Sequence, residues 1–205
     1  VTGWLVKRTG GAGGSHVRKA SPRHRARAQR YFQRRQGGRT LSALFAADGR
    51  GARVIGFNEQ WTADIAQCAP YCYGGAVSGI PLPQAVQARI ATGLDRLVRA
   101  TGLVGLNGLD FILDADGEPY VLEINPRPTA TLDLYDADFA GGLFALHLRA
   151  CQGELPAIQR RDGSRAHAIV YATDALRVPS ALNWPEWCTD IPESGSVIPA
   201  GAPLC

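Results

Sequence analysis

The feature that most constrains this chain is an Asp-Gly pair between two runs of alternating apolar residues, within residues 106–125. Asp116-Gly117 is typical of a two-residue hairpin turn, because such a turn needs a positive φ angle at both central positions. A turn centred there fixes the register of both strands, since side chains alternate between the two faces. One face is then apolar and is expected to face the core. It is formed by three cross-strand pairs: Leu113 with Tyr120, Phe111 with Leu122, and Leu109 with Ile124.

Two carboxylates face each other on the other side of this predicted hairpin. The register places Asp110 opposite Glu123, and it places Asn125 beside them. Like charges directly opposed across a strand pair destabilise it unless something compensates them. A divalent cation such as Mg²⁺ would do so, because it prefers carboxylate and amide oxygens as ligands. Arg127 could instead neutralise the pair, so a metal site and an ion-pair cluster both remain open.

A glycine-rich loop follows a predicted strand over residues 4–7. Lys7 ends this strand and would supply a positive point charge. The loop contains small residues whose backbone N–H groups can close over phosphates, namely Gly10, Gly11, Gly13, Gly14 and Ser15. Its spacing is neither that of a Walker A motif nor that of a dinucleotide-binding turn. A phosphate-binding loop and a flexible linker are both compatible with this pattern.

The rest of the chain alternates strand and helix patterns. Apolar residues recur at helical spacing between Pro83 and Gly102, which predicts a helix over residues 84–101. A second helix is predicted over 139–152. Further strands are predicted at 31–36, 41–47, 54–61, 106–113, 120–125 and 166–172, whereas 18–30 and 67–83 have irregular patterns. This order predicts an α+β (mixed α/β) fold.

Charge is distributed unevenly along the chain. Residues 1–47 hold 11 of the 22 Lys and Arg and none of the 18 Asp and Glu, whereas residues 48–205 sum to 11 − 18 = −7. This separation suits a polyanionic ligand with metal ions beside it. Nucleic acid is a rival ligand for the basic segment, but aromatic residues within 18–39 are confined to Tyr31 and Phe32. Nucleic acid is therefore not expected as a partner.

Composition indicates a globular cytoplasmic protein. No apolar run approaches the roughly 20 residues needed to cross a bilayer, and the first residues do not form a signal peptide. The five cysteines are expected to be reduced thiols, because only Cys68 and Cys72 are close and zinc sites need further ligands. The chain contains no Met and opens in an apolar segment at Val1, so we expect it to be a fragment.

Three blocks of the sequence resemble the ATP-grasp superfamily in order and spacing, namely residues 4–17, 31–49 and 102–129. The last block is similar to the metal-binding hairpin of carboxylate-amine ligases in that superfamily. This resemblance implies an ATP-grasp fold with antiparallel sheets and packed helices. It also implies ATP as the nucleotide and Mg²⁺ or Mn²⁺ as the metal.

The resemblance also implies roles for individual residues. Asp110, Glu123 and Asn125 would hold two Mg²⁺ ions that bridge the ATP phosphates, and Arg127 would stabilise the transferred phosphoryl group. Lys7 would contact the phosphates beneath the glycine-rich loop. The other implied nucleotide contacts are Gln33, Arg34, Gln36 and Thr40. Many relatives have carboxylates where this chain has Gln33 and Thr40.

The function implied by the resemblance is ATP-dependent ligation of a carboxylate to an amine through an acyl phosphate, with ADP and phosphate released. Small-molecule acids and amines would be the partners, and a homodimer is left open. The implied domains are residues 1–49 with the glycine-rich loop, 50–152 with the hairpin, and 153–205 as a small β-rich extension. We expect this chain to lack the N-terminal domain typical of the family, which leaves the activity of the fragment open. A non-catalytic nucleotide-binding module is the alternative.

Overall fold

The computed structural model describes residues 3–11, 13–155, 157–158 and 163–205. Val1, in the predicted apolar start, and Ala12, inside the predicted glycine-rich loop, lie outside the described residues. The chain forms two compact units. The first comprises Val1–Arg35, Trp61–Gly75 and Ala168–Cys205, and the second Gln36–Gln60 and Ala76–His167. These units are interleaved along the sequence, so the three consecutive domains remain a prediction.

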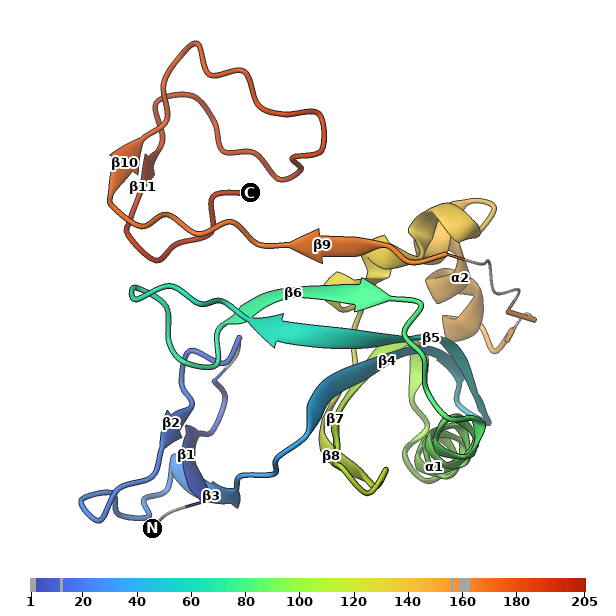
Figure 1. Ribbon diagram of the computed structural model, residues 1–205. Coiled ribbons are helices and arrows are strands. Elements are labelled where there is room, and N and C mark those ends of the chain that lie inside the picture. Colours follow the sequence, from blue (N-terminus) through green and yellow to red (C-terminus); the bar gives the residue numbers. More distant parts are fainter. Residues whose placement is uncertain (1–2, 12, 156, 159–162) are drawn as a thin grey trace. The chain divides into compact units, whose positions relative to one another are not determined.

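A six-stranded sheet forms the frame of the second unit. Its strand order is β8 (Pro119–Asn125), β7 (Val104–Leu113), β4 (Arg39–Asp48), β5 (Ala52–Thr62), β6 (Tyr73–Ser78) and β9 (Ala166–Ala168). Antiparallel pairing joins β4 to β5 and β7, and β7 to β8. Helix α1 (Gln84–Thr101) packs on one face of this sheet and α2 (Gly142–Cys151) on the other, as Figure 1 shows. The α+β class predicted from sequence is confirmed.

Helix α1 has the predicted bounds at both ends. It buries one apolar stripe, formed by Val86, Ile90, Leu94 and Val98, against the sheet. Gly102 ends the helix in the left-handed conformation, with φ of 72°, and its N–H donates to the carbonyl of Val98 at 2.8 Å. Glycine suits this position because it has no Cβ to oppose a positive φ. Among the described helices, none is long and apolar enough to cross a membrane.

The β7–β8 hairpin has the predicted register where the acidic residues lie, but the predicted turn is wrong. Asp110 pairs with Glu123 as expected, whereas Leu113 pairs with Pro119 instead of Tyr120. The side chain of Asp114 accepts from the backbone N–H groups of Asp116 and Glu118, which makes the connection longer than two residues. The register shifts by one residue between the two ends, at a bulge in β8.

The bulge also changes which side chains of β8 face the core. Phe111 is fully buried, as predicted, but its partner is Val121 instead of Leu122. Tyr120 was expected on the core face, and it is 44% exposed. The predicted apolar pairing therefore holds only near Leu109 and Ile124, beyond the bulge.

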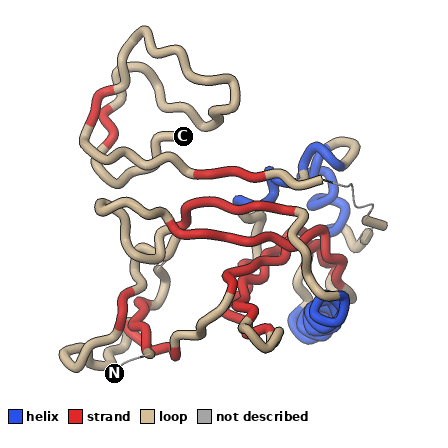
Figure 2. The backbone as a smooth tube through the Cα atoms, viewed as in Figure 1, coloured by secondary structure: helices blue, strands red, loops and turns tan. Residues whose placement is uncertain are grey.

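The first unit contains two small antiparallel sheets. One has the order β2 (Arg18–Lys19), β1 (Trp4–Arg8) and β3 (Arg30–Arg34), and the other pairs β10 (Leu176–Arg177) with β11 (Val197–Ile198). Figure 2 shows that the part after residue 168 consists mainly of loops joined by these short strands.

Strand β6 lies in a segment predicted to be irregular, and this prediction was wrong. Gly74 and Gly75 suggested a loop, yet both belong to the strand. A Cβ at Gly74 would overlap the backbone at Thr62 and Ala63, so glycine allows a close approach of two chain segments here. Two 3-10 helices, η1 (Ala130–Leu134) and η2 (Asp136–Asp138), connect β8 to α2.

Candidate functional site

A row of polar side chains occupies the face of the six-stranded sheet that is turned away from α1. Ser42 on β4 pairs with Asp110 on β7, and Asp110 pairs with Glu123 on β8. Cross-strand partners share a face because side chains alternate along each strand. The same pairing places further residues on this face, which we call the polar face: Thr40, Asn58, Gln60 and Asn125.

Asp110 is the most perturbed carboxylate of this polar face. Its side chain accepts hydrogen bonds from Gln60 Nε2 at 3.2 Å and from Asn125 Nδ2 at 2.9 Å. Burial raises the pKa of Asp110, the charge of Glu123 raises it further, and the result is a pKa of about 6. The two hydrogen bonds and the charge of Arg127 lower the pKa but do not offset these effects. A buried carboxyl whose pKa is raised, with a second carboxylate opposite it, is typical of functional sites.

The ion-pair alternative depends on Arg127, which follows the hairpin. Arg127 is exposed, and its guanidinium donates to the carbonyl of Pro128 at 3.0 Å. Within the described chain, the ion pairs do not include one from Arg127 to Asp110 or Glu123. The opposed carboxylates are therefore not neutralised by direct contact with this arginine.

Sequence reasoning missed two residues that support the polar face, one on β5 and one between η1 and η2. Asn58 is fully buried, and its Nδ2 donates to Ser42 Oγ at 3.2 Å. The hydroxyl of Tyr135 donates to Asn58 Oδ1 at 2.6 Å. A signal was present, because Asn58 and Gln60 are two residues apart on a strand that is otherwise largely apolar.

Removing the Tyr135 hydroxyl is expected to destabilise the protein. Tyr135→Phe leaves Asn58 Oδ1 without this donor and also loses the bond to the carbonyl of Phe57 at 3.2 Å. We expect the free energy of unfolding to fall by about 1–2 kcal/mol in urea titrations. Tyr120→Phe is the matched control, because that hydroxyl belongs to a side chain 44% exposed. Equal effects of both changes would contradict a structural role for Tyr135.

Lys7 and Gln33, two of the predicted nucleotide contacts, lie on the same face of the three-stranded sheet in the first unit. Lys7 lies on the central strand β1, is half-buried and pairs with Tyr31, while Gln33 pairs with Leu5. These four residues share one face of the three-stranded sheet. Arg34 pairs with Trp4 and lies on the opposite face, so the predicted nucleotide contacts of β3 point in two directions.

The predicted glycine-rich loop connects β1 to β2. Gly14 has a φ of +72°, and a Cβ there would overlap the carbonyl of Tyr71, so this position requires glycine for packing. A Cβ at Gly10 or at Gly13 would have none of the described atoms within 4 Å, apart from those of its own chain neighbours. Gly11 lies against the ring of His16, and Ser15 is exposed. The loop is thus anchored at Gly14 and open around Gly10 and Gly13.

Thr40 and Gln36, the remaining predicted nucleotide contacts, belong to the second unit. Thr40 pairs with Ile112 and lies on the polar face, next to the pair of Ser42 and Asp110. Gln36 is half-buried and precedes β4. The structure therefore brings Thr40 together with the three predicted metal ligands.

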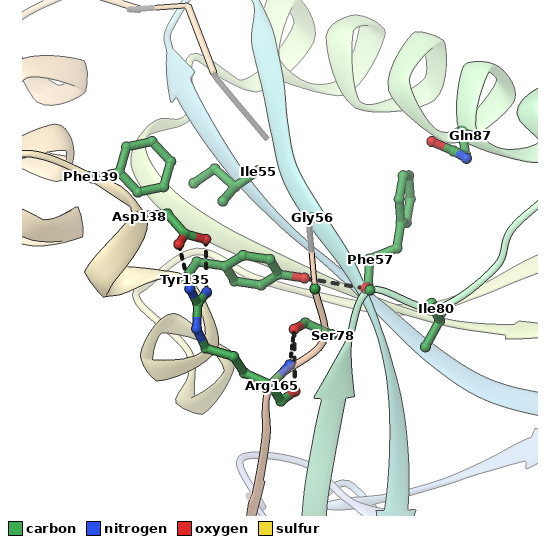
Figure 3. Close-up of a pocket in the computed structure, with 12 residues that line it drawn as sticks. Ile55, Gly56, Phe57, Ser78, Ile80, Gln87, Tyr135, Asp138, Phe139 and Arg165 are labelled. Atoms are coloured by element: carbon green, nitrogen blue, oxygen red, sulfur yellow. Dashed lines mark hydrogen bonds and ion pairs between the residues drawn. The ribbon is translucent and has the colours of Figure 1, made fainter. Parts of the chain in front are cut away.

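A small pocket of about 90 Å³ lies between β5, β6 and the segment after β8 (Figure 3). Asp138 forms a bidentate ion pair with Arg165 at 2.6 and 2.9 Å, and Arg165 also exchanges backbone hydrogen bonds with Ser78 Oγ. Asp136 accepts from the N–H of Leu143 in the first turn of α2. Asp136 and Asp138 therefore stabilise the fold through these contacts.

The five cysteines are free thiols, as predicted. Among the described residues, no group of three or more His, Cys, Asp or Glu side chains is placed to hold a metal. The predicted set at the hairpin is of a different kind, because it combines two carboxylates with the amide of Asn125.

A family model described as an ATP-grasp domain matches residues 1–131 of this chain. The chain belongs to the ATP-grasp family. A D-alanine–D-alanine ligase from Bordetella petrii is 46% identical over 50 residues, which cover 24% of this chain and 15% of that protein. The ATP-grasp fold predicted from the sequence is thereby confirmed.

Solved structures give the same fold. The biotin carboxylase domain of a 2-oxoglutarate carboxylase from Hydrogenobacter thermophilus, in complex with MgADP and bicarbonate, has a TM-score of 0.70 and 12% identity. That match covers 100% of this chain and 50% of the other. An L-amino acid ligase from Bacillus licheniformis has a TM-score of 0.66 and 15% identity, over 87% of this chain and 49% of that chain. This ATP-grasp chain thus spans about half the length of these structures.

Proposed function

We propose that this chain is the ATP- and metal-binding part of an ATP-dependent ligase that joins a carboxylate to an amine. The observation that carries the proposal is the direct cross-strand pairing of Asp110 with Glu123, beside Asn125. The family match supports the ligase class, since the relatives named above include a D-alanine–D-alanine ligase and an L-amino acid ligase.

The residues of the polar face fit Mg²⁺ or Mn²⁺. Asp110, Glu123 and Asn125 offer carboxylate and amide oxygens, which are hard ligands suited to either ion. Burial and the charge of Glu123 raise the pKa of Asp110, and a bound cation would favour its ionised form. The bound ion would neutralise negative charge on phosphate oxygens. Because the amide of Asn125 donates to Asp110 at 2.9 Å, it would turn its oxygen toward the ion on binding.

The proposed reaction has two steps. An oxygen of the substrate carboxylate attacks the γ-phosphorus of ATP, the bond to the bridging oxygen breaks, and ADP leaves. The nitrogen of the amine then attacks the acyl carbon, phosphate leaves, and the nitrogen loses one proton. Both steps build negative charge on phosphoryl oxygens, so fixed positive charge is the main contribution required of the protein.

Residues of this chain would supply that charge and exclude water. Arg127 is exposed beside the hairpin and offers a planar set of donors that fits phosphoryl oxygens. Lys7 would contact the nucleotide phosphates as a point charge. The open region around Gly10 and Gly13 would bring backbone N–H groups over the phosphates, and closure would protect the acyl phosphate from hydrolysis.

The test is an ADP-release assay on the full-length protein with pooled carboxylic acids and amines. ADP formation that requires both an acid and an amine supports the ligase. A non-catalytic nucleotide-binding module is the competing function, favoured by Gln33 and Thr40 at positions where relatives have carboxylates. Calorimetric binding of a non-hydrolysable ATP analogue, without ADP release under any acid and amine combination, would favour that module and reject the ligase.

Divalent-ion binding is expected to weaken below pH 6. The pKa of Asp110 is about 6 without metal, so at lower pH the ion must displace a proton from this carboxyl. Affinity for Mn²⁺ should be constant above about pH 7 and fall up to tenfold for each unit below the pKa. Electron paramagnetic resonance of free Mn²⁺ measures this directly. Asp110→Asn is the control, and the persistence of the same pH dependence in that variant would remove Asp110 from the site.

A further inference from the structure

Two side-chain amides hold the carboxylate of Asp110, one at each oxygen. Gln60 Nε2 donates to Oδ1 at 3.2 Å, and Asn125 Nδ2 donates to Oδ2 at 2.9 Å. Only the NH₂ end of an amide can donate, so both side chains turn their nitrogen toward the carboxylate. The proposed function uses Asn125 as a metal ligand, but it gives no role to Gln60.

Gln60 reaches Asp110 across an intervening strand. Asp110 lies on β7 and Gln60 on β5, and β4 separates these two strands in the sheet. Neighbouring strands are about 4.8 Å apart, so the backbones of β5 and β7 are roughly 10 Å apart. The residues of β4 on this part of the polar face, Thr40 and Ser42, have short side chains and leave room for this contact. A long side chain at position 60 is therefore needed to make it.

The two amides cannot play the same part once an ion is bound. Asn125 offers its oxygen to the ion only by turning its NH₂ group away, which breaks its hydrogen bond to Asp110 Oδ2. Gln60 comes from the other side of β7, and its bond to Oδ1 does not depend on the orientation of Asn125. Oδ2 is then released for the ion while Oδ1 stays held.

A carboxylate without such a hold has no fixed direction. The terminal torsion of an Asp side chain has a broad distribution, so its two oxygens turn easily. A neighbouring donor restricts that rotation, and residues that orient a metal ligand in this way typically contribute 10- to 100-fold to metal affinity. Gln60 has the position and the donor group for this task.

We infer that Gln60 is a positioning residue of the proposed metal site, whose amide holds Oδ1 of Asp110 so that Oδ2 is presented to the ion. The inference rests on the proposed function, because it requires Asp110 and Asn125 to be metal ligands. Gln60 itself acts through Asp110 and is not a ligand.

Mn²⁺ binding to the full-length protein at pH 8, followed by electron paramagnetic resonance of the free ion, tests this role. Gln60→Leu keeps a side chain of similar size without the amide, and it should raise the Kd for Mn²⁺ by about 10- to 100-fold. Gln60→Asn keeps an amide that is one methylene shorter, so it should weaken binding to a similar extent. Unchanged affinity in both variants would overturn the inference.

ADP formation by the Gln60→Leu variant separates positioning from a folding defect. If Gln60 acts by orienting Asp110, the variant should need more Mn²⁺, and saturating Mn²⁺ should restore kcat. A misfolded variant has fewer active molecules at every Mn²⁺ concentration. A kcat that stays low at saturating Mn²⁺ would therefore overturn the positioning role.

Gln87→Leu is the matched control. Gln87 also donates from a side-chain amide, to the carbonyl of Leu82 at 2.8 Å, but it lies on α1, away from the polar face. Its replacement should leave the affinity for Mn²⁺ unchanged. If the unchanged protein bound no Mn²⁺, the proposed function would fail and this inference with it. If the unchanged protein bound Mn²⁺ and Gln60→Leu bound it equally tightly, only the role of Gln60 would be overturned.

Discussion

Replacing Glu123 with Gln is expected to reduce ADP formation by the full-length protein by about 10³-fold. Glu123 pairs directly with Asp110 and is exposed on the polar face, where its carboxylate can reach a bound ion. The change keeps the size of the side chain but removes its charge. The coupled ADP-release assay under saturating ATP measures the effect, and Mn²⁺ binding to the same variant separates metal loss from other causes.

Glu118→Gln provides a control in the same hairpin. Glu118 is exposed at the turn and forms an ion pair with Arg89 on α1 at 2.5 Å. It carries the same charge as Glu123 but lies outside the polar face, so its loss should change ADP formation less than about twofold. If Glu123→Gln retained full activity and full Mn²⁺ affinity, the metal role of the hairpin would be wrong.

Asp110→Asn is expected to stabilise the protein without metal while abolishing divalent-ion binding. The pKa of Asp110 is raised from 3.8 to about 6, so the folded state binds this proton more tightly than the unfolded state. The free energy of unfolding therefore falls as pH rises from about 4 to 6 and stays lower above that window. Removing this ionisation should raise the free energy of unfolding at pH 8 by about 3 kcal/mol.

Urea titrations in EDTA at pH 8 and pH 4 measure this difference. The stabilisation by Asp110→Asn should be full at pH 8 and mostly lost at pH 4, where the carboxyl is protonated in the folded state and about half protonated in the unfolded state. Adding Mg²⁺ should stabilise the unchanged chain and leave the variant unaffected. Asp116→Asn, at an exposed position of the same hairpin, is the control. A destabilising effect of Asp110→Asn at pH 8 would show that the hydrogen bonds from Gln60 and Asn125 outweigh the cost of the buried charge, and would contradict the prediction.

The hairpin shows which structural features the local sequence pattern predicted correctly and which it did not. Alternation of apolar residues predicted the pairing of Asp110 with Glu123, because a buried face fixes the register of a strand. The same reasoning placed the turn at Asp116-Gly117 and was wrong there. The side chain of Asp114 bonds to two backbone N–H groups, and a bulge in β8 compensates for the longer connection. These hydrogen bonds and the bulge depend on particular side chains and on local backbone geometry. A pattern of apolar residues does not predict them.

The sequence alone determined the α+β class, helix α1 and the opposed carboxylates, because these depend on periodicities and on neighbours within one hairpin. Only the tertiary structure placed Gln60 and Asn58 beside Asp110 and Ser42, because long-range strand pairing joins residues far apart in the chain. Tertiary structure also decided the pKa of Asp110. Burial and the proximity of Glu123 set that value, and both arise only when the sheet has formed.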